Sequence, residues 1–494
     1  MKRLIVIVFI IFGAFLTLCL YRTYAYDTSV VEEVPSTTDL EYTFKIGNSS
    51  IKQITVDSGE TRYYDIVLGN PNNAKISYGV YYEMVSPSTK PDGYSIEYTS
   101  KSTGNSTGKV DKNGNITLNL VVTNASSSTV TVKLGTVAGY VNGGELTLGS
   151  GQVIIPKALV NAVELITNLN DGTTGDSGSG VYKIIHSAIP AGSSATGSEI
   201  PAVTDYRYYG PSPNNYICLD MEGQSTCPDK HLYRIIGSIY DEKENTNRLK
   251  LIKATPLTDG TTSEFSWDYR VFNNGGVVYS NIWATITSGN YSNSLTSGSQ
   301  LMKLLNSGAW WNGTSGSYYN DSTTATTVNF TNYKLSDKAK SYITTSRYYL
   351  GGYNIFGGVM TNQFYTYERG TARYDNNRPL YWDGMVGLMY PSDYGYAAGN
   401  SCVTGTALYN YDGECKNKDW LWMTTRSDYT SRGEWLMSPK SATSMGMFSV
   451  DSSGYVSGDY SSVNTFSVRP VFFLNSSASI SSGDGSINNP YILS

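Results

Sequence analysis

Histidine is almost absent from this chain, which has 2 in 494 residues, His186 and His231. A Ser/His/Asp hydrolase would therefore have only these two candidates for its general base. His186 lies inside the apolar run that begins at Tyr182, and His231 follows the loop that begins at Cys227. Both positions are typical of structural histidines, so the sequence gives this kind of catalysis little support.

Charge is also scarce. Charged residues make up 16% of the chain, and 36 basic residues face 41 acidic ones for a net charge of −5. A protein that binds nucleic acid usually carries a basic face, because it must neutralise phosphates. We therefore expect no nucleic acid among its partners.

Cysteine is rare but patterned. Four of the five cysteines lie outside the N-terminal segment: Cys218, Cys227, Cys402 and Cys415. An even number in an exported chain indicates two disulfides, and the short spacings favour Cys218–Cys227 and Cys402–Cys415 among the three connectivities. A zinc site is disfavoured because the chain has no Cys-x-x-Cys pair and only His231 lies near a cysteine.

The first 25 residues predict export. Lys2 and Arg3 precede the apolar run 4–20, so residues 1–25 are either a cleaved signal sequence or an uncleaved membrane anchor, with the remainder of the chain outside. The sequence leaves both alternatives open. A polar tether over 26–40 follows, and we expect a protein that is membrane-anchored or secreted.

Tyrosine and glycine are abundant, at 42 and 49 residues, and this composition suits an extracellular β protein. Over 41–165, apolar residues alternate with polar ones in about seven short segments, one of which carries Ile116, Leu118, Leu120 and Val122 on one face. This pattern resembles the immunoglobulin-like β-sandwiches of Gram-positive surface proteins. Residues 166–180 are rich in Gly, Ser, Thr and Asp, which predicts a flexible linker and a domain boundary.

Beyond this linker, residues 181–494 mix strands, loops and two short helices. The segments 232–236 and 249–252 predict a strand pair. Helices are expected over 300–306 and from Ser336 or Asp337 to about Thr344. Near the end, the hairpin of 450–457 turns at Asp451-Ser-Ser-Gly454, and Ser467 begins an apolar closing strand.

The final motifs, Trp435-Leu-Met-Ser-Pro439 and Ser467-Val-Arg-Pro470, resemble the bacterial C-type lectin-like domains related to formylglycine-generating enzymes. The resemblance implies a mainly β protein with minor α, in which an immunoglobulin-like β-sandwich precedes a loop-rich α+β lectin-like domain over 181–494. It also implies that Arg469 is a buried ion-pair partner. Trp435 begins an apolar run, which favours a core position. Oxidase activity in that family needs cysteines late in the domain, and none follows Cys415.

Binding has more support than catalysis. Aromatic rings and polar residues alternate from Tyr381 onward, and such surfaces hold glycans or peptides. The aromatic residues expected to contact a ligand are Tyr394, Tyr396, Trp422, Tyr455 and Tyr460. The candidates for glycoside chemistry are Glu368, Asp375, Asp383, Asp393, Asp419, Asp428 and Glu434, but no spacing selects a pair.

The sequence therefore predicts an exported surface protein that binds a glycan or a protein ligand at a cell surface. It would contact the membrane through residues 4–20 if these are uncleaved. We expect no cofactor, with calcium as the alternative because many lectin-like domains use it. An enzyme on the same scaffold and a structural envelope subunit are the alternative functions.

Overall fold

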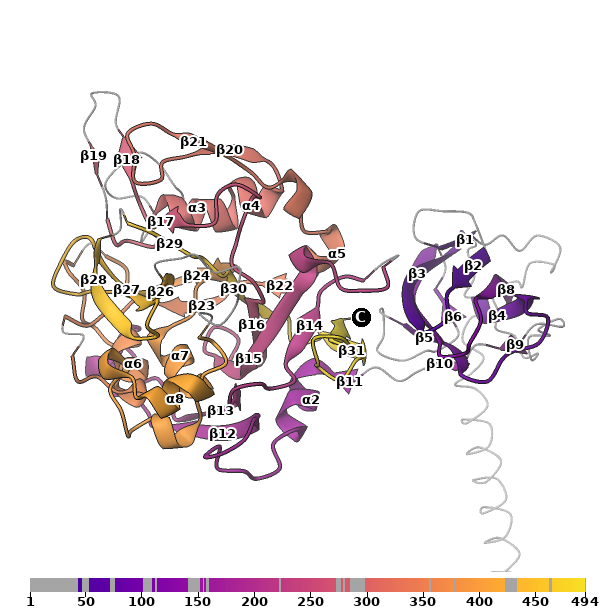
Figure 1. Ribbon diagram of the computed structural model, residues 1–494, viewed down its shortest axis with the longest axis horizontal. Coiled ribbons are helices and arrows are strands. Elements are labelled where there is room, and N and C mark those ends of the chain that lie inside the picture. Colours follow the sequence, from indigo (N-terminus) through magenta and orange to yellow (C-terminus); the bar gives the residue numbers. More distant parts are fainter. Residues whose placement is uncertain are drawn as a thin grey trace, which may run out of the picture. The chain divides into compact units, whose positions relative to one another are not determined.

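The computed structural model describes residues 43–46, 53–71, 76–100, 109–111, 113–140, 152–153, 155–156, 160–221, 224–271, 277–278, 280–284, 298–354, 357–376, 378–422, 433–461 and 464–493. The protein is mainly β, with 39% strand and 17% helix. The chain divides into two compact units, unit 1 (Met1–Lys157) and unit 2 (Ala158–Ser494). Figure 1 labels most of their elements.

Unit 1 consists of two sheets that share one core. One sheet has the order β1-β3-β7-β5-β10, and the other has the order β2-β8-β4-β6, with β9 added to β4. The strands are β1 (Thr43–Ile46), β2 (Gln53–Val56), β3 (Glu60–Asn70), β4 (Ile76–Ser86), β5 (Tyr94–Ser100), β6 (Lys109–Val110), β7 (Gly114–Asn124), β8 (Val130–Tyr140), β9 (Gln152–Val153) and β10 (Ile155–Pro156).

The core of unit 1 follows the sequence pattern closely. Ile116, Leu118, Leu120 and Val122 are all buried on β7, and Val130, Val132 and Leu134 are buried on β8. Because successive side chains of a strand point to opposite faces, this alternation fixes which face of each sheet turns inward. The predicted two-sheet core of unit 1 is confirmed.

Unit 2 is built on one large sheet. Its main path runs β11-β31-β32-β14-β15-β16-β30-β22; β13 joins β15 and carries β12, and β25 joins β30. The strands are β11 (Val160–Asn161), β12 (Gly180–His186), β13 (Val203–Tyr209), β14 (Tyr216–Cys218), β15 (Leu232–Asp241), β16 (Thr246–Lys253), β22 (Ile343–Thr344), β25 (Val386–Gly387), β30 (Val471–Leu474), β31 (Ser479–Ser482) and β32 (Tyr491–Leu493).

Smaller elements surround this sheet. The three-stranded sheet consists of β26 (Gly433–Pro439), β27 (Gly446–Asp451) and β28 (Val456–Ser461). Four strand pairs are β17 (Phe265–Ser266) with β29 (Thr465–Phe466), β18 (Arg270–Val271) with β19 (Val277–Val278), β20 (Ser315–Tyr318) with β21 (Thr326–Asn329), and β23 (Ser346–Tyr349) with β24 (Tyr381–Gly384). The helices are α2 (Ala162–Asn168), α3 (Gln300–Asn306), α4 (Ala309–Asn312), α5 (Asp337–Tyr342), α6 (Thr361–Glu368), α7 (Pro391–Ala397) and α8 (Gly413–Lys418).

Local signals in unit 2 are confirmed where they are strong. The first predicted helix is α3. The second is α5, which begins at Asp337 after the N-cap Ser336, whose side chain accepts a hydrogen bond from the Ala339 amide. It ends at Tyr342, before the predicted end near Thr344, because Ile343 and Thr344 form β22. The predicted strand pair is β15 with β16, and β27 turns into β28 at Gly454, which has a φ of +81°. The predicted closing strand from Ser467 is a strand only over Val471–Leu474 (β30), which is buried, and β31 and β32 follow it.

The predicted linker over 166–180 is wrong. The boundary between the units falls between Lys157 and Ala158, and Ala162 and Ile166 of α2 are buried in the core of unit 2. The Asn400 amide donates to the Gly175 carbonyl at 3.0 Å, and Gly175 packs on the Tyr182 ring. Glycine and serine serve here for close packing, so residues 160–180 belong to unit 2.

The predicted signal or anchor (1–25) and the tether (26–40) lie outside the described residues. Among the helices that the structure describes, none is long and apolar enough to cross a membrane.

Candidate functional site

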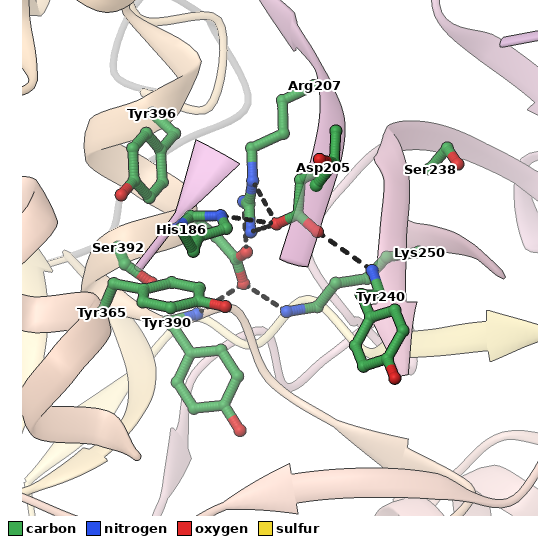
Figure 2. A network of polar contacts seen from close by, with 12 residues as sticks. His186, Asp205, Arg207, Ser238, Tyr240, Lys250, Tyr365, Tyr390, Ser392 and Tyr396 are labelled. Carbon is green, nitrogen blue, oxygen red and sulfur yellow. Dashed lines mark hydrogen bonds and ion pairs between the residues drawn. The ribbon is translucent and has the colours of Figure 1, made fainter. Parts of the chain in front are cut away.

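A buried ionic network joins four elements of unit 2 (Figure 2). Its members are His186 on β12, Asp205 and Arg207 on β13, Lys250 on β16 and Asp393 on α7. Arg207 donates to Asp205 at 2.9 Å and to Asp393 at 2.8 Å, and Lys250 donates to Asp393 at 2.5 Å. The His186 Nε2 lies 3.0 Å from the Asp205 carboxylate. All five side chains are buried.

The network balances its charges internally. Burial opposes ionisation of both aspartates, but Arg207 and its cationic neighbours outweigh it and hold the pKa of Asp205 and of Asp393 below the usual range. Burial also lowers the pKa of His186, and Asp205 opposes that shift only in part. Two carboxylates thus face the Arg207 guanidinium and the Lys250 ammonium beside a neutral imidazole, which is how a buried ionic cluster is stabilised. Burial lowers the pKa of Lys250, and Asp393 opposes that shift only in part.

His186 does not form a catalytic triad. Its imidazole stacks on the Tyr365 ring with a centroid separation of 3.7 Å, and in the described part of the chain no hydroxyl group bonds to it. His231 is buried beside the Cys218–Cys227 disulfide, and burial lowers its pKa to about 4. Neither histidine is placed as a general base.

A second ionic group adjoins the network. Glu368 accepts hydrogen bonds from the Ser392 amide at 2.9 Å and from its hydroxyl at 2.6 Å, and the Arg369 guanidinium lies 3.4 Å from the same carboxylate. Burial raises the pKa of Glu368 to about 7, an effect that Arg369 only partly offsets. Arg369 also reaches Glu242 at 3.8 Å and covers the Tyr365 ring at 3.6 Å. The group ties α6 to α7.

Two of the five predicted contact residues are core residues, so the expected exposure is wrong for them. Tyr394 is fully buried and donates to the Gly454 carbonyl at 2.9 Å. Tyr396 is also buried, with the Arg207 guanidinium 4.9 Å from its ring. The turn-like sequence around them forms α7, and Gly395 is needed there because a Cβ would lie 2.0 Å from the Thr361 hydroxyl. They cannot contact a ligand at the surface.

Of the other three predicted contact residues, Trp422 and Tyr455 are partly exposed, and the side chain of Tyr460 is not described. Trp422 and Tyr455 are half-buried, and the Lys416 ammonium covers both rings, at 5.2 Å and 4.7 Å from their centroids. Tyr460 lies on β28, but its side chain is outside the described residues. Trp422 and Tyr455 remain accessible, and they are the predicted contact residues that the structure brings together.

The structural assignments made from the sequence are confirmed. Trp435 is fully buried, and Arg469 forms a buried ion pair with Glu434 at 2.7 Å. Both disulfides are present, Cys218–Cys227 and Cys402–Cys415. Disulfides persist in oxidising compartments, so they support a location outside the cytoplasm.

A narrow pocket of unit 2 is formed by segments that are distant in the sequence; we call it the Trp283 pocket. The cavity itself is about 20 Å³, which is room for about one water molecule. Its walls consist of Asn281, Ile282, Trp283, Leu350, Arg373, Tyr374, Arg378, Pro379, Met437, Pro439 and Lys440. Aromatic, aliphatic and basic side chains thus meet in one concave place, as in many ligand sites.

Two buried polar atoms of this pocket have no hydrogen-bond partner. They are the Trp283 Nε1 and the Asn281 Oδ1, on side chains that are each 2% exposed. A buried donor or acceptor without a partner costs about 1–3 kcal/mol, so it needs a water or a ligand to satisfy it. Both atoms are closed off from solvent, so a ligand does not reach them in this conformation.

The polar groups of the pocket are held by the turn between β26 and β27. The Asn281 side-chain amide donates to the carbonyls of Lys440, Thr443 and Gly446 at 2.8–3.1 Å. The Asn281 backbone amide and the Arg378 guanidinium both donate to the Ser444 carbonyl at 2.9 Å. These contacts fix Asn281 and Arg378 in place before any ligand arrives.

Sequence reasoning missed this pocket because its walls come from four separate segments. One signal was available: Arg369, Arg373 and Arg378 lie within ten residues of a chain in which charge is scarce. Nothing local connects them with Trp283.

Among the described residues, no group of three or more His, Cys, Asp or Glu side chains is arranged to hold a metal ion. The requirement for calcium stays open to experiment. No family model, no curated protein and no solved structure matches this chain, so its function is argued from its geometry.

Proposed function

We propose that the chain is an exported surface protein that binds a glycan or a protein ligand at a cell surface, and that the Trp283 pocket is its binding site. The lectin-like character that the C-terminal motifs suggest belongs to this proposal. We also propose that residues 4–20 contact the membrane if they are not cleaved.

One observation carries the proposal: among the residues that line the pocket, an exposed aromatic ring stands beside polar side chains that other contacts already fix. Tyr374 adds a ring that is 48% exposed, with the Arg378 guanidinium 5.0 Å from its centroid. An exposed aromatic ring beside fixed polar groups supplies contact area at little entropic cost. In contrast, the titratable groups of the buried ionic network are bonded to one another, which gives catalysis no comparable support.

The proposal is tested with the full-length chain on arrays of glycans and of cell-surface proteins. Replacing Tyr374 with Ala should weaken the captured interaction by roughly 1 kcal/mol or more, as for a genuine anchor residue, without changing thermal stability. The matched control is Tyr381→Ala, which removes another exposed tyrosine, one that stacks on Arg347 at 4.2 Å outside the pocket. Equal effects of the two substitutions would refute the assignment of the pocket.

A further inference from the structure

A larger cavity of unit 2 lies between the hairpin β20–β21 and the helices α3 and α4 (Figure 1); we call it the β20 groove. Its volume is about 400 Å³, within the range of ordinary ligand sites, and it shares no lining residue with the Trp283 pocket. All four residues of β20, Ser315–Tyr318, line it. The groove therefore follows this strand along its length.

The edge of β20 on the groove side has no partner strand. Among the described strands, β20 pairs with β21 alone. The Phe330 amide donates to the Thr314 carbonyl at 3.0 Å, so these two residues form a hydrogen-bonded pair of the ladder. Because bonded and non-bonded pairs alternate in an antiparallel ladder, Ser315 and Ser317 are non-bonded positions. Their N–H and C=O groups therefore point away from β21.

Two contacts agree with this orientation. On the other edge of the hairpin, the Asn329 amide points outward and donates to the Asp259 carboxylate at 2.8 Å. On the groove side, the Gln300 side chain accepts from the Tyr319 N–H at 3.3 Å and donates to the Tyr319 C=O at 2.5 Å. Gln300 thus bonds to the end of this edge as a neighbouring strand would.

The rest of the edge is open. Within the described residues, no hydrogen bond reaches the outward backbone groups of Ser315 and Ser317, and both residues are exposed. From this open edge and the cavity beside it, we infer that the β20 groove binds an extended segment of a partner protein as an added β-strand. The inference goes beyond the proposed function, because it concerns a second site and a second kind of ligand.

The open edge distinguishes a polypeptide from a glycan. A strand repeats its backbone donors and acceptors every two residues, or about 6.6–6.8 Å, which is the repeat that Ser315 and Ser317 present. A partner strand in antiparallel register exchanges two hydrogen bonds with each of these residues. A glycan offers hydroxyl groups without this repeat, so the edge favours a peptide.

The lining residues indicate which side chains the partner carries. Leu304 and Ala309 are buried apolar residues of the wall, and Gly316 keeps the space beside them open because a Cβ there would lie 3.2 Å from the Ala309 Cβ. Small aliphatic side chains suit that wall, at alternate positions of the added strand. The exposed Lys303 is the charged residue of the lining, which includes no carboxylate. The remaining positions of the partner strand should therefore be acidic or neutral.

The test measures binding of the full-length chain to a fluorescent, end-blocked pentapeptide, Thr-Val-Glu-Val-Thr, by anisotropy. We expect this peptide to bind more tightly than Thr-Val-Lys-Val-Thr, with a difference that shrinks as salt is added. Ser317→Pro should weaken binding by about tenfold or more, because proline removes a backbone donor that the added strand needs. An edge strand tolerates proline where its N–H faces outward, so the hairpin should still form.

The matched control is Thr327→Pro. Thr327 pairs with Ser317 in the same hairpin, but its N–H faces the opposite edge, and it does not line the groove. This variant should bind the peptide as the parent chain does, and melting temperatures compare the folding of the two. Equal loss of affinity in both variants would overturn the assignment of the edge.

A second measurement needs no variant of the chain. Methylating the peptide's backbone nitrogens at alternate residues should abolish binding in one of the two possible series and spare it in the other, because every second N–H faces β20. Equal effects of the two series, or displacement of the peptide by a neutral hexose trisaccharide, would overturn strand addition. Absence of peptide binding would overturn the inference, and self-association of the chain that Ser317→Pro abolishes would then assign the edge to a second copy.

Discussion

The two units of this protein are stabilised in different ways. In unit 1, the buried polar residues among the described side chains are three asparagines, Asn70, Asn119 and Asn124, in an otherwise apolar core. Unit 2 holds every buried carboxylate, lysine and arginine that the structure describes. Arg207 and Asp393, for example, pair across 186 positions of sequence. Alternation of apolar residues is enough to specify unit 1, whereas unit 2 depends on charges that meet only in the folded chain.

The largest expected difference between the two units comes from removing one charge of the buried ionic network in unit 2. Arg207→Met leaves Asp205 and Asp393 buried with a cation missing, and such a loss costs about 3–5 kcal/mol. Calorimetry should show a much lower melting temperature for unit 2 and an unchanged transition for unit 1. The control is Arg347→Met, which breaks a half-exposed ion pair with Asp383 and should cost less than about 1 kcal/mol. Equal effects of the two substitutions would contradict this account of unit 2.

Removal of a disulfide should have the second-largest effect, and it should lower the stability of unit 2 alone. Both bridges lie in unit 2, across 9 and 13 residues, and a bridge of this kind contributes about 2–4 kcal/mol. Replacing Cys402 and Cys415 with Ser together should lower the urea midpoint of unit 2 and leave that of unit 1 unchanged. A shift of both midpoints would show that the units do not unfold independently.

The pH dependence of stability sharpens the same contrast. Burial raises the pKa of Glu368 from 4.5 to about 7. Between these two pH values, Glu368 is therefore protonated in folded unit 2 and ionised in the unfolded chain. Its contribution therefore destabilises unit 2 as pH rises, by at most about 1.4 kcal/mol per pH unit. His186 acts in the opposite direction, because its lowered pKa makes stability fall as pH drops through 6.5.

The substitution Glu368→Gln removes the loss of stability with rising pH that Glu368 causes, and Gln can still accept a hydrogen bond from the Ser392 amide. Urea unfolding at pH 5 and pH 8 should then show unit 2 gaining more stability with pH than the parent chain does. An identical pH response in the two proteins would mean that Glu368 is ionised in folded unit 2.

The smallest expected effect concerns the tyrosines. Tyr394→Phe removes the hydrogen bond to the Gly454 carbonyl and should cost about 1 kcal/mol of stability. Tyr455→Phe changes a half-buried ring and should leave the melting temperature within experimental error. A loss of ligand affinity from Tyr394→Phe at unchanged stability would restore the surface role that the sequence suggested.

The sequence predicted what depends on neighbouring residues. The alternation on β7, the N-cap of α5 and the pairing of closely spaced cysteines all follow from local spacing. Tyr394 was misjudged because a Pro-Ser-Asp-Tyr-Gly run looks the same in a surface turn and in a buried helix; contacts with distant residues decide between them. The Trp283 pocket was missed for the same reason, since Trp283 and Arg373 meet only through tertiary structure.

The position of β32 in the large sheet has a consequence for how the protein is made. This strand, Tyr491–Leu493, lies between β31 and β14 and pairs in parallel with the latter, more than 270 residues upstream. Because synthesis proceeds from the N-terminus, the large sheet stays incomplete until Leu493 has emerged. Unit 1 has all its strands long before that moment. A ribosome that stops before Tyr491 therefore releases a folded unit 1 joined to an unfinished unit 2, which proteases can cleave.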